Sequence, residues 1–134
     1  MTGSRRTIAV SSLALALAAI VGLGAQAPSV KRTVLQQGDL SVAGREAVMA
    51  LAELPQGGTT GRHTHPGEEI SYVLEGSVII EVDGKPAMTR KAGEVFMIPA
   101  GTVHNAHNKG GVTAKVIATS VSYTHLTLPT NREV

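Results

Sequence analysis

The sequence contains no cysteine among its 134 residues. A disulfide framework and a metal site built from thiolates are therefore both excluded. Any metal that this chain binds must be held by nitrogen and oxygen atoms, which its five histidines and ten acidic residues can supply. The length allows one domain at most.

Aromatic side chains are also scarce, because the chain has no tryptophan, one phenylalanine and two tyrosines. Between residues 28 and 119 only Tyr72 and Phe96 remain, too few to stack on the bases of a single-stranded nucleic acid. The formal charge of +2 is not concentrated there either, since that segment holds nine basic and nine acidic residues. We therefore expect no nucleic-acid partner.

A long apolar run occurs at the N-terminus. Two arginines precede the apolar residues 8–24, and the small-x-small sequence Ala25-Gln26-Ala27 follows them. These three parts predict a secretory signal peptide over residues 1–27, helical and cleaved after Ala27. The run is short for a retained membrane anchor, so we expect an exported protein, periplasmic or extracellular, with no stable membrane span after cleavage.

The sequence leaves the export route open. Residues 4–8, Ser-Arg-Arg-Thr-Ile, resemble a twin-arginine signal, which exports folded proteins. Ala9 and Val10 depart from the usual continuation of that signal, and paired arginines also occur in signals of the general secretory route.

After a linker over residues 28–33, short apolar or β-branched runs alternate with turns rich in glycine, proline and asparagine. This spacing predicts an all-β barrel or sandwich, a single domain over residues 34–119. Asp83-Gly84 predicts a two-residue hairpin turn. The alanine-rich residues 45–54 are assigned to a strand rather than a helix, because turn sequences flank them. The other strands are predicted at residues 31–37, 70–74, 78–82, 95–98 and 112–119, and from His104 onward.

Two histidines, His63 and His65, alternate along an extended segment, so their side chains point to the same face about 6–7 Å apart. Glu69 follows a Pro-Gly turn and adds a carboxylate, and His104 lies thirty-five residues further on. Three imidazoles and one carboxylate suit a divalent first-row metal, such as iron, manganese, nickel, copper or zinc. We therefore predict that these four side chains hold one metal ion.

Ten residues of this chain, in order and at matching spacings, resemble the two motifs of the cupin superfamily, in its small single-domain bacterial form. The first motif is Gly57-x5-His63-x-His65-x3-Glu69-x6-Gly76, and the second is Gly93-x5-Pro99-x-Gly101-x2-His104-x3-Asn108. The resemblance spans residues 34–119. It implies a jelly-roll β-barrel of six to eight strands with the ion inside its mouth. It also implies the same four ligands, with a structural role for Asn108.

Members of the superfamily include dioxygenases, decarboxylases, isomerases and proteins that only bind a ligand, so the fold alone does not choose among them. Around six-coordinate iron, manganese, nickel or copper, four protein ligands leave two positions open, whereas tetrahedral zinc would be closed. We therefore expect a metal-dependent small-molecule enzyme of dioxygenase type, an oxidoreductase in which Glu69 could act as a base by family analogy. The alternatives are a non-catalytic module that binds a small ligand or a metal, and a metal-dependent isomerase or decarboxylase.

Other side chains near the motifs are assigned to the surface or the core. Glu68 is expected to face solvent, because the motif spacing selects its neighbour as the ligand. His107 lies three residues from His104 on a strand, so it faces the opposite way and is not expected to bind the metal. Arg62 could bind an anionic substrate, but its parity favours a solvated side chain. Three methionines are expected to fill the core, namely Met49, Met88 and Met97.

Residues 120–134 do not continue the pattern of the barrel. They resemble a spurious C-terminus that arises when sequencing-adapter DNA is translated, so we expect this tail to be non-native and assign no role to His125. An ordinary disordered tail, or a closing strand at residues 124–128, is the alternative. The remaining core of about 92 residues is small for a barrel with exposed edges, so we expect a homodimer that pairs strands or packs sheet faces.

Overall fold

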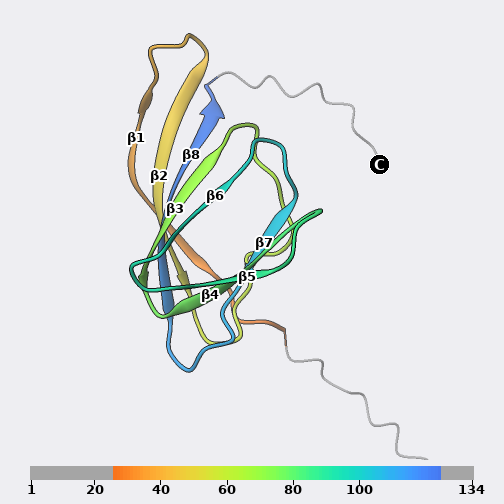
Figure 1. Cartoon of the computed structure of the whole chain (residues 1–134). Coiled ribbons are helices and arrows are strands. Elements are labelled where there is room, and N and C mark those ends of the chain that lie inside the picture. Colours follow the sequence, from red (N-terminus) through yellow and green to blue (C-terminus); the bar gives the residue numbers. More distant parts are fainter. Residues whose placement is uncertain (1–25, 125–134) are drawn as a thin grey trace, which may run out of the picture.

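The computed structural model describes residues 26–124, which form eight β-strands (Figure 1). They are β1 (Lys31–Asp39), β2 (Arg45–Leu54), β3 (Glu69–Glu75), β4 (Ser77–Val82), β5 (Met88–Lys91), β6 (Val95–Ile98), β7 (His104–His107) and β8 (Ala114–Tyr123). The all-β prediction is confirmed, while the predicted signal-peptide helix lies outside the described residues. Within residues 26–124 no helix has the length and apolar character needed to cross a membrane.

The strands form two antiparallel sheets. One sheet has five strands in the order β1-β2-β8-β3-β6, and the other has three in the order β5-β4-β7. Figure 1 shows β1, β2 and β8 as a long twisted layer, with β4, β5 and β7 on the other side of the molecule. The chain passes from the first sheet to the second at Gly76, whose φ of 72° allows a one-residue connection between β3 and β4.

The core lies between the two sheets because successive residues of a strand point to opposite faces. In β4 the alternate residues Val78, Ile80 and Val82 are buried, and the residues between them are half-buried. The five-stranded sheet supplies the other side of this core, with Leu54, Val73, Phe96, Ile98, Ala114 and Val116.

The outer face of the five-stranded sheet is also apolar, and it is exposed. One row of cross-strand neighbours runs Met49, Thr119, Ile70 and Met97, and the next runs Leu51, Ile117, Tyr72 and Val95. Ile70, Met97 and Val95 are 62%, 55% and 60% exposed. The prediction that the methionines fill the core is therefore correct for Met88, which packs against the core, and wrong for Met49 and Met97.

The strand at β5 was not predicted, because Thr89, Arg90 and Lys91 provide no apolar run. Asp83-Gly84 does form the predicted turn, in which the N–H of Lys85 donates to the carbonyl oxygen of Val82 at 3.0 Å. Pairing of β4 with β5 nevertheless begins only at Ile80 and Met88. Two positions further toward the turn, this register would join Val82 to Pro86, which has no N–H to donate.

Two strands extend beyond their predicted ends. The last strand was predicted over residues 112–119, but β8 continues to Tyr123 and pairs there with Arg45 of β2. The first strand was predicted over residues 31–37, and β1 begins at Lys31 as predicted but continues to Asp39. The origin of the tail stays a prediction, and most of it lies outside the described residues.

Candidate metal centre

His63 and His104 are brought together by a short antiparallel contact. The N–H of each donates to the carbonyl oxygen of the other, both at 3.0 Å. The contact belongs to a longer pairing in which residues 57–63 run beside β7, with the N–H of Thr60 donating to the oxygen of Ala106. Directly opposed residues place their side chains on the same face, so the two imidazole centroids lie 4.3 Å apart.

His65 completes a group of three histidines. Its ring centroid lies 5.8 Å from that of His63 and 4.7 Å from that of His104. The N–H of Gly101 donates to the carbonyl oxygen of His65 at 2.9 Å and connects this segment to the turn before β7. One ring nitrogen from each histidine lies within 4.8 Å of the other two, so the structure assembles the three predicted histidines into one cluster.

The hydrogen bonds of the three rings turn the same nitrogen of each toward the cluster. Every Nδ1 contacts a backbone carbonyl oxygen, at Gly61 for His63 (2.8 Å), Gly67 for His65 (3.1 Å) and Thr102 for His104 (2.9 Å). A carbonyl only accepts, so each Nδ1 carries a hydrogen, and Nε2 is the nitrogen that faces the cluster, at His65 with Oε2 of Glu69 2.8 Å away. Histidines that bind metals use this arrangement, in which the outer nitrogen donates to a carbonyl and fixes the ring. The donor set therefore fits a divalent metal ion.

Burial favours the neutral form of His104. Its residue surface is 4% exposed, and burial is the largest influence on its pKa, which lies below the ordinary value for histidine. The hydrogen bond to Thr102 acts in the opposite direction but does not cancel the effect. A neutral imidazole is the form that binds a metal.

Glu69 lies beside the cluster at the start of β3. Its Oε2 atom is 2.8 Å from Nε2 of His65 and 3.9 Å from Nε2 of His104. Its other oxygen accepts a hydrogen bond of 2.6 Å from the buried hydroxyl of Ser71, which fixes the carboxylate. The neighbouring Glu68 is exposed, as predicted. Among the described residues the compact group within 4.8 Å consists of the three histidines, with Glu69 adjacent to it.

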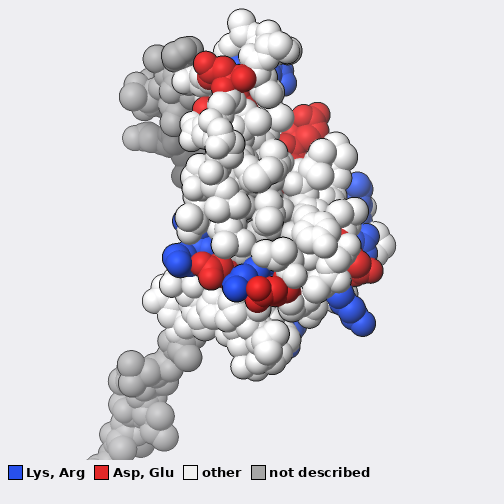
Figure 2. All heavy atoms as spheres, turned by 90° about the vertical axis from the view of Figure 1, so that its left-hand side faces the viewer, with Lys and Arg blue, Asp and Glu red and all other residues white. Residues whose placement is uncertain are grey.

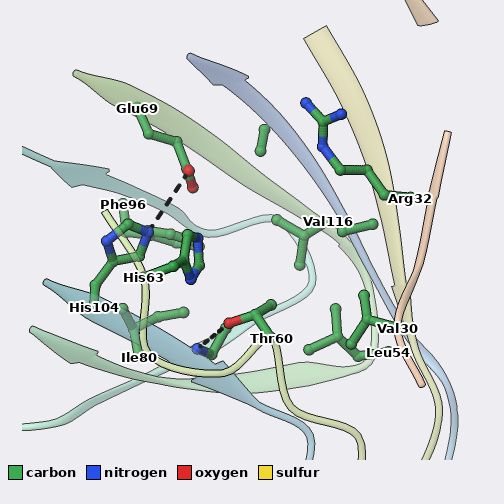
Figure 3. Close-up of a pocket in the computed structure, with 13 residues that line it drawn as sticks. Val30, Arg32, Leu54, Thr60, His63, Glu69, Ile80, Phe96, His104 and Val116 are labelled. Atoms are coloured by element: carbon green, nitrogen blue, oxygen red, sulfur yellow. Dashed lines mark hydrogen bonds and ion pairs between the residues drawn. The ribbon is translucent and has the colours of Figure 1, made fainter. Parts of the chain in front are cut away.

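The cluster forms part of the wall of a cavity between the sheets, with a volume of about 310 Å³ (Figure 3). His63, Glu69 and His104 lie on one side of it. Most of the remaining wall is apolar and includes Leu54, Ile80, Phe96 and Val116. A second hollow of about 350 Å³ adjoins the cluster and is lined by His65 as well. A molecule in the cavity would therefore contact both the histidines and apolar side chains.

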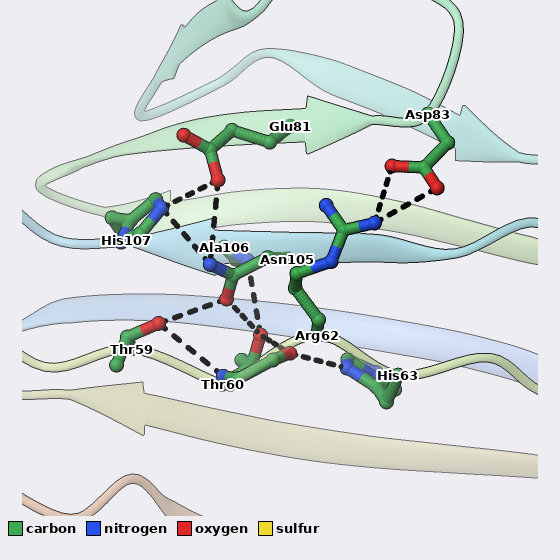
Figure 4. Close-up of polar contacts among 10 residues, drawn as sticks. Thr59, Thr60, Arg62, His63, Glu81, Asp83, Asn105, Ala106 and His107 are labelled. Carbon is green, nitrogen blue, oxygen red and sulfur yellow. Dashed lines mark hydrogen bonds and ion pairs between the residues drawn. The ribbon is translucent and has the colours of Figure 1, made fainter.

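His107 belongs to a separate network on the opposite face of β7 (Figure 4). Its Nε2 lies 2.8 Å from Oε2 of Glu81, and this hydrogen bond is the largest cause of a lowered pKa for that carboxylate. Asn105 extends the network, because its Oδ1 accepts hydrogen bonds from Thr59 at 2.8 Å and Thr60 at 3.1 Å. The prediction that His107 faces away from the centre is confirmed, and the network attaches residues 57–63 to β7.

Arg62 also points away from the cavity. Its Nη2 donates to both carboxylate oxygens of Asp83, at 2.7 and 2.8 Å, and its side chain is exposed (Figure 4). The predicted solvated position of this arginine is therefore confirmed.

Two residues at the centre were missed by sequence reasoning. Ser71 follows Glu69 by two positions, so the alternation of a strand already places both on one face. Arg32 lines both hollows, although it lies on β1, whose residues are exposed throughout. No sequence signal identified Arg32, because its place at the cavity depends on the pairing of β1 with β2.

This chain belongs to the cupin family, because residues 50–120, more than half of its length, match the family of the cupin domain. Solved structures agree on the fold. A cupin domain from Bordetella pertussis superimposes with a TM-score of 0.60 at 21% identity, covering 74% of this chain and 99% of that chain. A cupin superfamily protein from Desulfitobacterium hafniense gives 0.60 at 20% identity, covering 73% and 82%.

Curated relatives match at higher identity over a shorter region. A germin-like protein of Oryza sativa, germin-like protein 1-1, is 41% identical over 75 residues, which cover 52% of this chain and 35% of that protein. An oxalate-binding protein of Thermotoga maritima is 35% identical over 72 residues, covering 53% and 59%. The matched region thus spans from about a third to three fifths of these relatives.

Proposed function

We propose that this cupin is a metal-dependent enzyme of dioxygenase type that acts on a small organic molecule. His63, His65, His104 and Glu69 are its metal ligands in this proposal. The observation that carries it is the convergence of one ring nitrogen from each of three histidines beside the carboxylate of Glu69, at the wall of an apolar cavity. A bound redox-active metal would supply a Lewis acid and a centre for reaction with dioxygen.

The protein groups have separate roles in this proposal. The three histidines bind and orient, and their backbone hydrogen bonds keep each ring in one tautomer. Glu69 is fixed through Oε1 by Ser71, so its Oε2 would bind the metal beside the cavity and would be able to accept a proton only when it is not bound to the metal. Phe96 and its apolar neighbours exclude water from the volume in which the substrate would lie.

The test loads the metal-free chain separately with iron(II), manganese(II), nickel(II), copper(II) and zinc(II). Dioxygen uptake is then followed with an electrode over a panel of phenols, thiols and carboxylic acids. We expect substrate-dependent uptake in at least one redox-active form, no uptake in the zinc form, and strongly reduced uptake in Glu69→Gln. Metal binding without dioxygen uptake in any form would reject the dioxygenase proposal.

A non-catalytic binding module is the second candidate. It is supported by relatives that carry an oxalate-binding name and, in Prunus persica, an auxin-binding name. The scarcity of acid–base groups in the cavity wall also supports it. Arg32 is the only ionisable described residue there besides the histidines and Glu69. The same scarcity disfavours a metal-dependent isomerase or decarboxylase, because Glu69 would have to carry every proton. Ligand binding without turnover in the experiment above would select the binding module.

Gly67 gives a test of how the loop positions His65. A Cβ atom on Gly67 would lie 2.5 Å from the Cβ of Val121 and 2.6 Å from its carbonyl oxygen, so Gly67→Ala must displace the loop from β8. The carbonyl oxygen of Gly67 accepts the hydrogen bond from Nδ1 of His65. We expect Gly67→Ala to weaken metal binding by about 10–100-fold, as loss of a supporting contact does in other metal sites, measured by competition with a chelating dye.

Gly38→Ala is the matched control, because no atom lies within 4 Å of the Cβ that it adds. It should bind metal as the unchanged chain does. Equal affinity in Gly67→Ala and Gly38→Ala would show that the loop does not position the ligand.

We also propose that the mature protein is exported and forms a homodimer. The export proposal rests on the signal-like residues 1–27.

The dimer proposal rests on the outer face of the five-stranded sheet, where Ile70, Val95 and Met97 are exposed side by side. Figure 2 shows the side of the molecule near β1, with a broad uncharged field above a band of charged side chains. A second copy packed on the sheet face would remove these apolar residues from water.

The dimer proposal is tested with Ile70→Lys, which places a charge in the middle of the exposed row. We expect a dimer for the unchanged chain and a monomer for the variant, measured by sedimentation velocity. Thr89→Lys, an exposed position on the other sheet, is the control and should remain dimeric. A monomeric unchanged chain, or a dimeric Ile70→Lys, would contradict this assembly.

A further inference from the structure

The two hollows beside the histidine cluster share part of their walls. Arg32, His63, Glu69 and Ala118 line both, so the inner cavity of about 310 Å³ and the outer hollow of about 350 Å³ meet at the cluster. Arg32 is therefore located where a molecule in the inner cavity would face the outer hollow. Among the described residues that line either space, it is the only lysine or arginine.

Within the part of the chain that the structure describes, Arg32 has no polar side-chain partner, in contrast to three other basic residues. Lys31 is paired with Glu53, Lys115 with Glu75, and Arg62 with Asp83. Among residues 26–124 no ion pair or side-chain hydrogen bond engages the guanidinium group of Arg32. Figure 3 shows Arg32 at the upper right, with Val116, Val30 and Leu54 below it and Glu69, His63 and His104 at the left. An unpaired guanidinium at the edge of a cavity is a ready partner for a carboxylate.

The wall of the inner cavity favours a second, apolar part of the ligand, in addition to a carboxylate at Arg32. Leu54, Ile80, Phe96 and Val116 form the apolar part of the wall, with Phe96 and Ile80 beside the histidines and Leu54 and Val116 further along the cavity. The volume exists because small residues occupy the inward positions of β2 and β8, where Ala52 and Ala118 line the cavity. A compact dianion such as oxalate would leave most of this apolar wall uncovered. An acid with a larger apolar body would cover it, at about 25 cal/mol for each Å² of apolar surface removed from water.

We propose that the ligand of this cavity is a small organic acid with an apolar body, and that Arg32 binds its carboxylate. The apolar body lies against Leu54, Phe96 and Val116, in a cavity whose wall also includes His63 and His104. The proposal rests on the proposed function, whose substrate class it specifies. Arg32 is a specificity-determining residue in this arrangement, because a neutral analogue of the same shape gains nothing from its charge.

The probes are phenylacetate, its neutral isostere phenylacetamide, and oxalate. Each is titrated by calorimetry into the metal-loaded chain and into the metal-free chain, with metal content measured in parallel. We expect phenylacetate to bind more tightly than oxalate. Arg32→Gln should weaken phenylacetate at least about tenfold and leave phenylacetamide unchanged, because only the acid makes charge-assisted hydrogen bonds. Arg62→Gln is the matched control and should change neither, since its side chain is bound to Asp83 outside the cavity.

Ala118→Leu tests the cavity independently of the charge. The larger side chain fills the shared part of the two hollows, so phenylacetate and phenylacetamide should both weaken while oxalate is little affected. Equal phenylacetate affinity in Arg32→Gln and the unchanged chain would overturn the proposal, as would tighter binding of oxalate than of phenylacetate. If the chain takes up no metal on loading but still shows Arg32-dependent binding of phenylacetate, the proposed enzyme function is contradicted and the acid site stands. If the chain takes up metal but phenylacetate binding does not depend on Arg32, the acid site is contradicted and the proposed metal centre stands.

Discussion

Replacing His63 with alanine is expected to remove the metal from this protein. The side chain supplies one of three Nε2 atoms that lie within 4.8 Å of one another, and two histidines with one carboxylate would remain. Loss of supporting contacts alone costs about 10–100-fold in other metal sites, so loss of a ligand should weaken binding by more than about 100-fold. Elemental mass spectrometry of the isolated protein should show near-stoichiometric metal in the unchanged chain and very little in the variant.

His63 is the most informative of the three histidines because its residue surface is exposed, whereas His104 is buried. Truncation at an exposed position changes the stability of the metal-free chain little, so loss of metal is not confused with unfolding. Metal at about one hundred times its Kd stabilises a protein by about 2.7 kcal/mol, and this increase should also disappear in His63→Ala. His107→Ala is the control and should keep both the metal and the increase. Full metal content in His63→Ala would exclude this cluster as the binding site.

The strands that were predictable are those with an apolar or β-branched run between turn signals. In β4 the run from Val78 to Val82 indicates the strand, and the structure shows that Val78, Ile80 and Val82 form its inner face. β5 has four residues and no such run, so only its pairing with β4 identifies it as a strand. The same dependence on a partner explains β8, whose last residues are extended because β2 continues beside them.

The site was predictable to the extent that local spacing and the motifs describe it. The alternation of His63 and His65 is local, but the contact of His63 with His104 joins residues far apart in the chain, and only the family resemblance anticipated it. Arg32 could not be assigned in this way. Its place at the cavity depends on the pairing of β1 with β2, where Arg32 lies opposite Ala52. Nothing in the exposed sequence of β1 distinguishes its two faces.

The second large expected effect is a loss of stability when Asn108, which lies away from the proposed metal, is replaced with alanine. Its residue surface is 0% exposed. The amide nitrogen donates to the carbonyl oxygens of Leu54 at 2.8 Å and Val112 at 2.7 Å, and the amide oxygen accepts from the N–H of Gly110 at 2.9 Å. Asn108→Ala removes all three hydrogen bonds, so the carbonyl oxygen of Leu54 loses the donor that Asn108 supplied in the buried interior. At about 1 kcal/mol for each bond we expect a loss of about 3 kcal/mol in the free energy of unfolding.

Urea unfolding followed by far-ultraviolet circular dichroism measures this loss, since the chain has no tryptophan to report on its core. The exposed neighbour Lys109 supplies the control, because Lys109→Ala should stay within about 0.5 kcal/mol of the unchanged chain. A domain of this size has about 5–15 kcal/mol in total, so Asn108→Ala removes a large share of it. The folded fraction of that variant should still bind metal, because none of the three bonds reaches the histidines. Metal loss in fully folded Asn108→Ala would contradict a purely structural role for this residue.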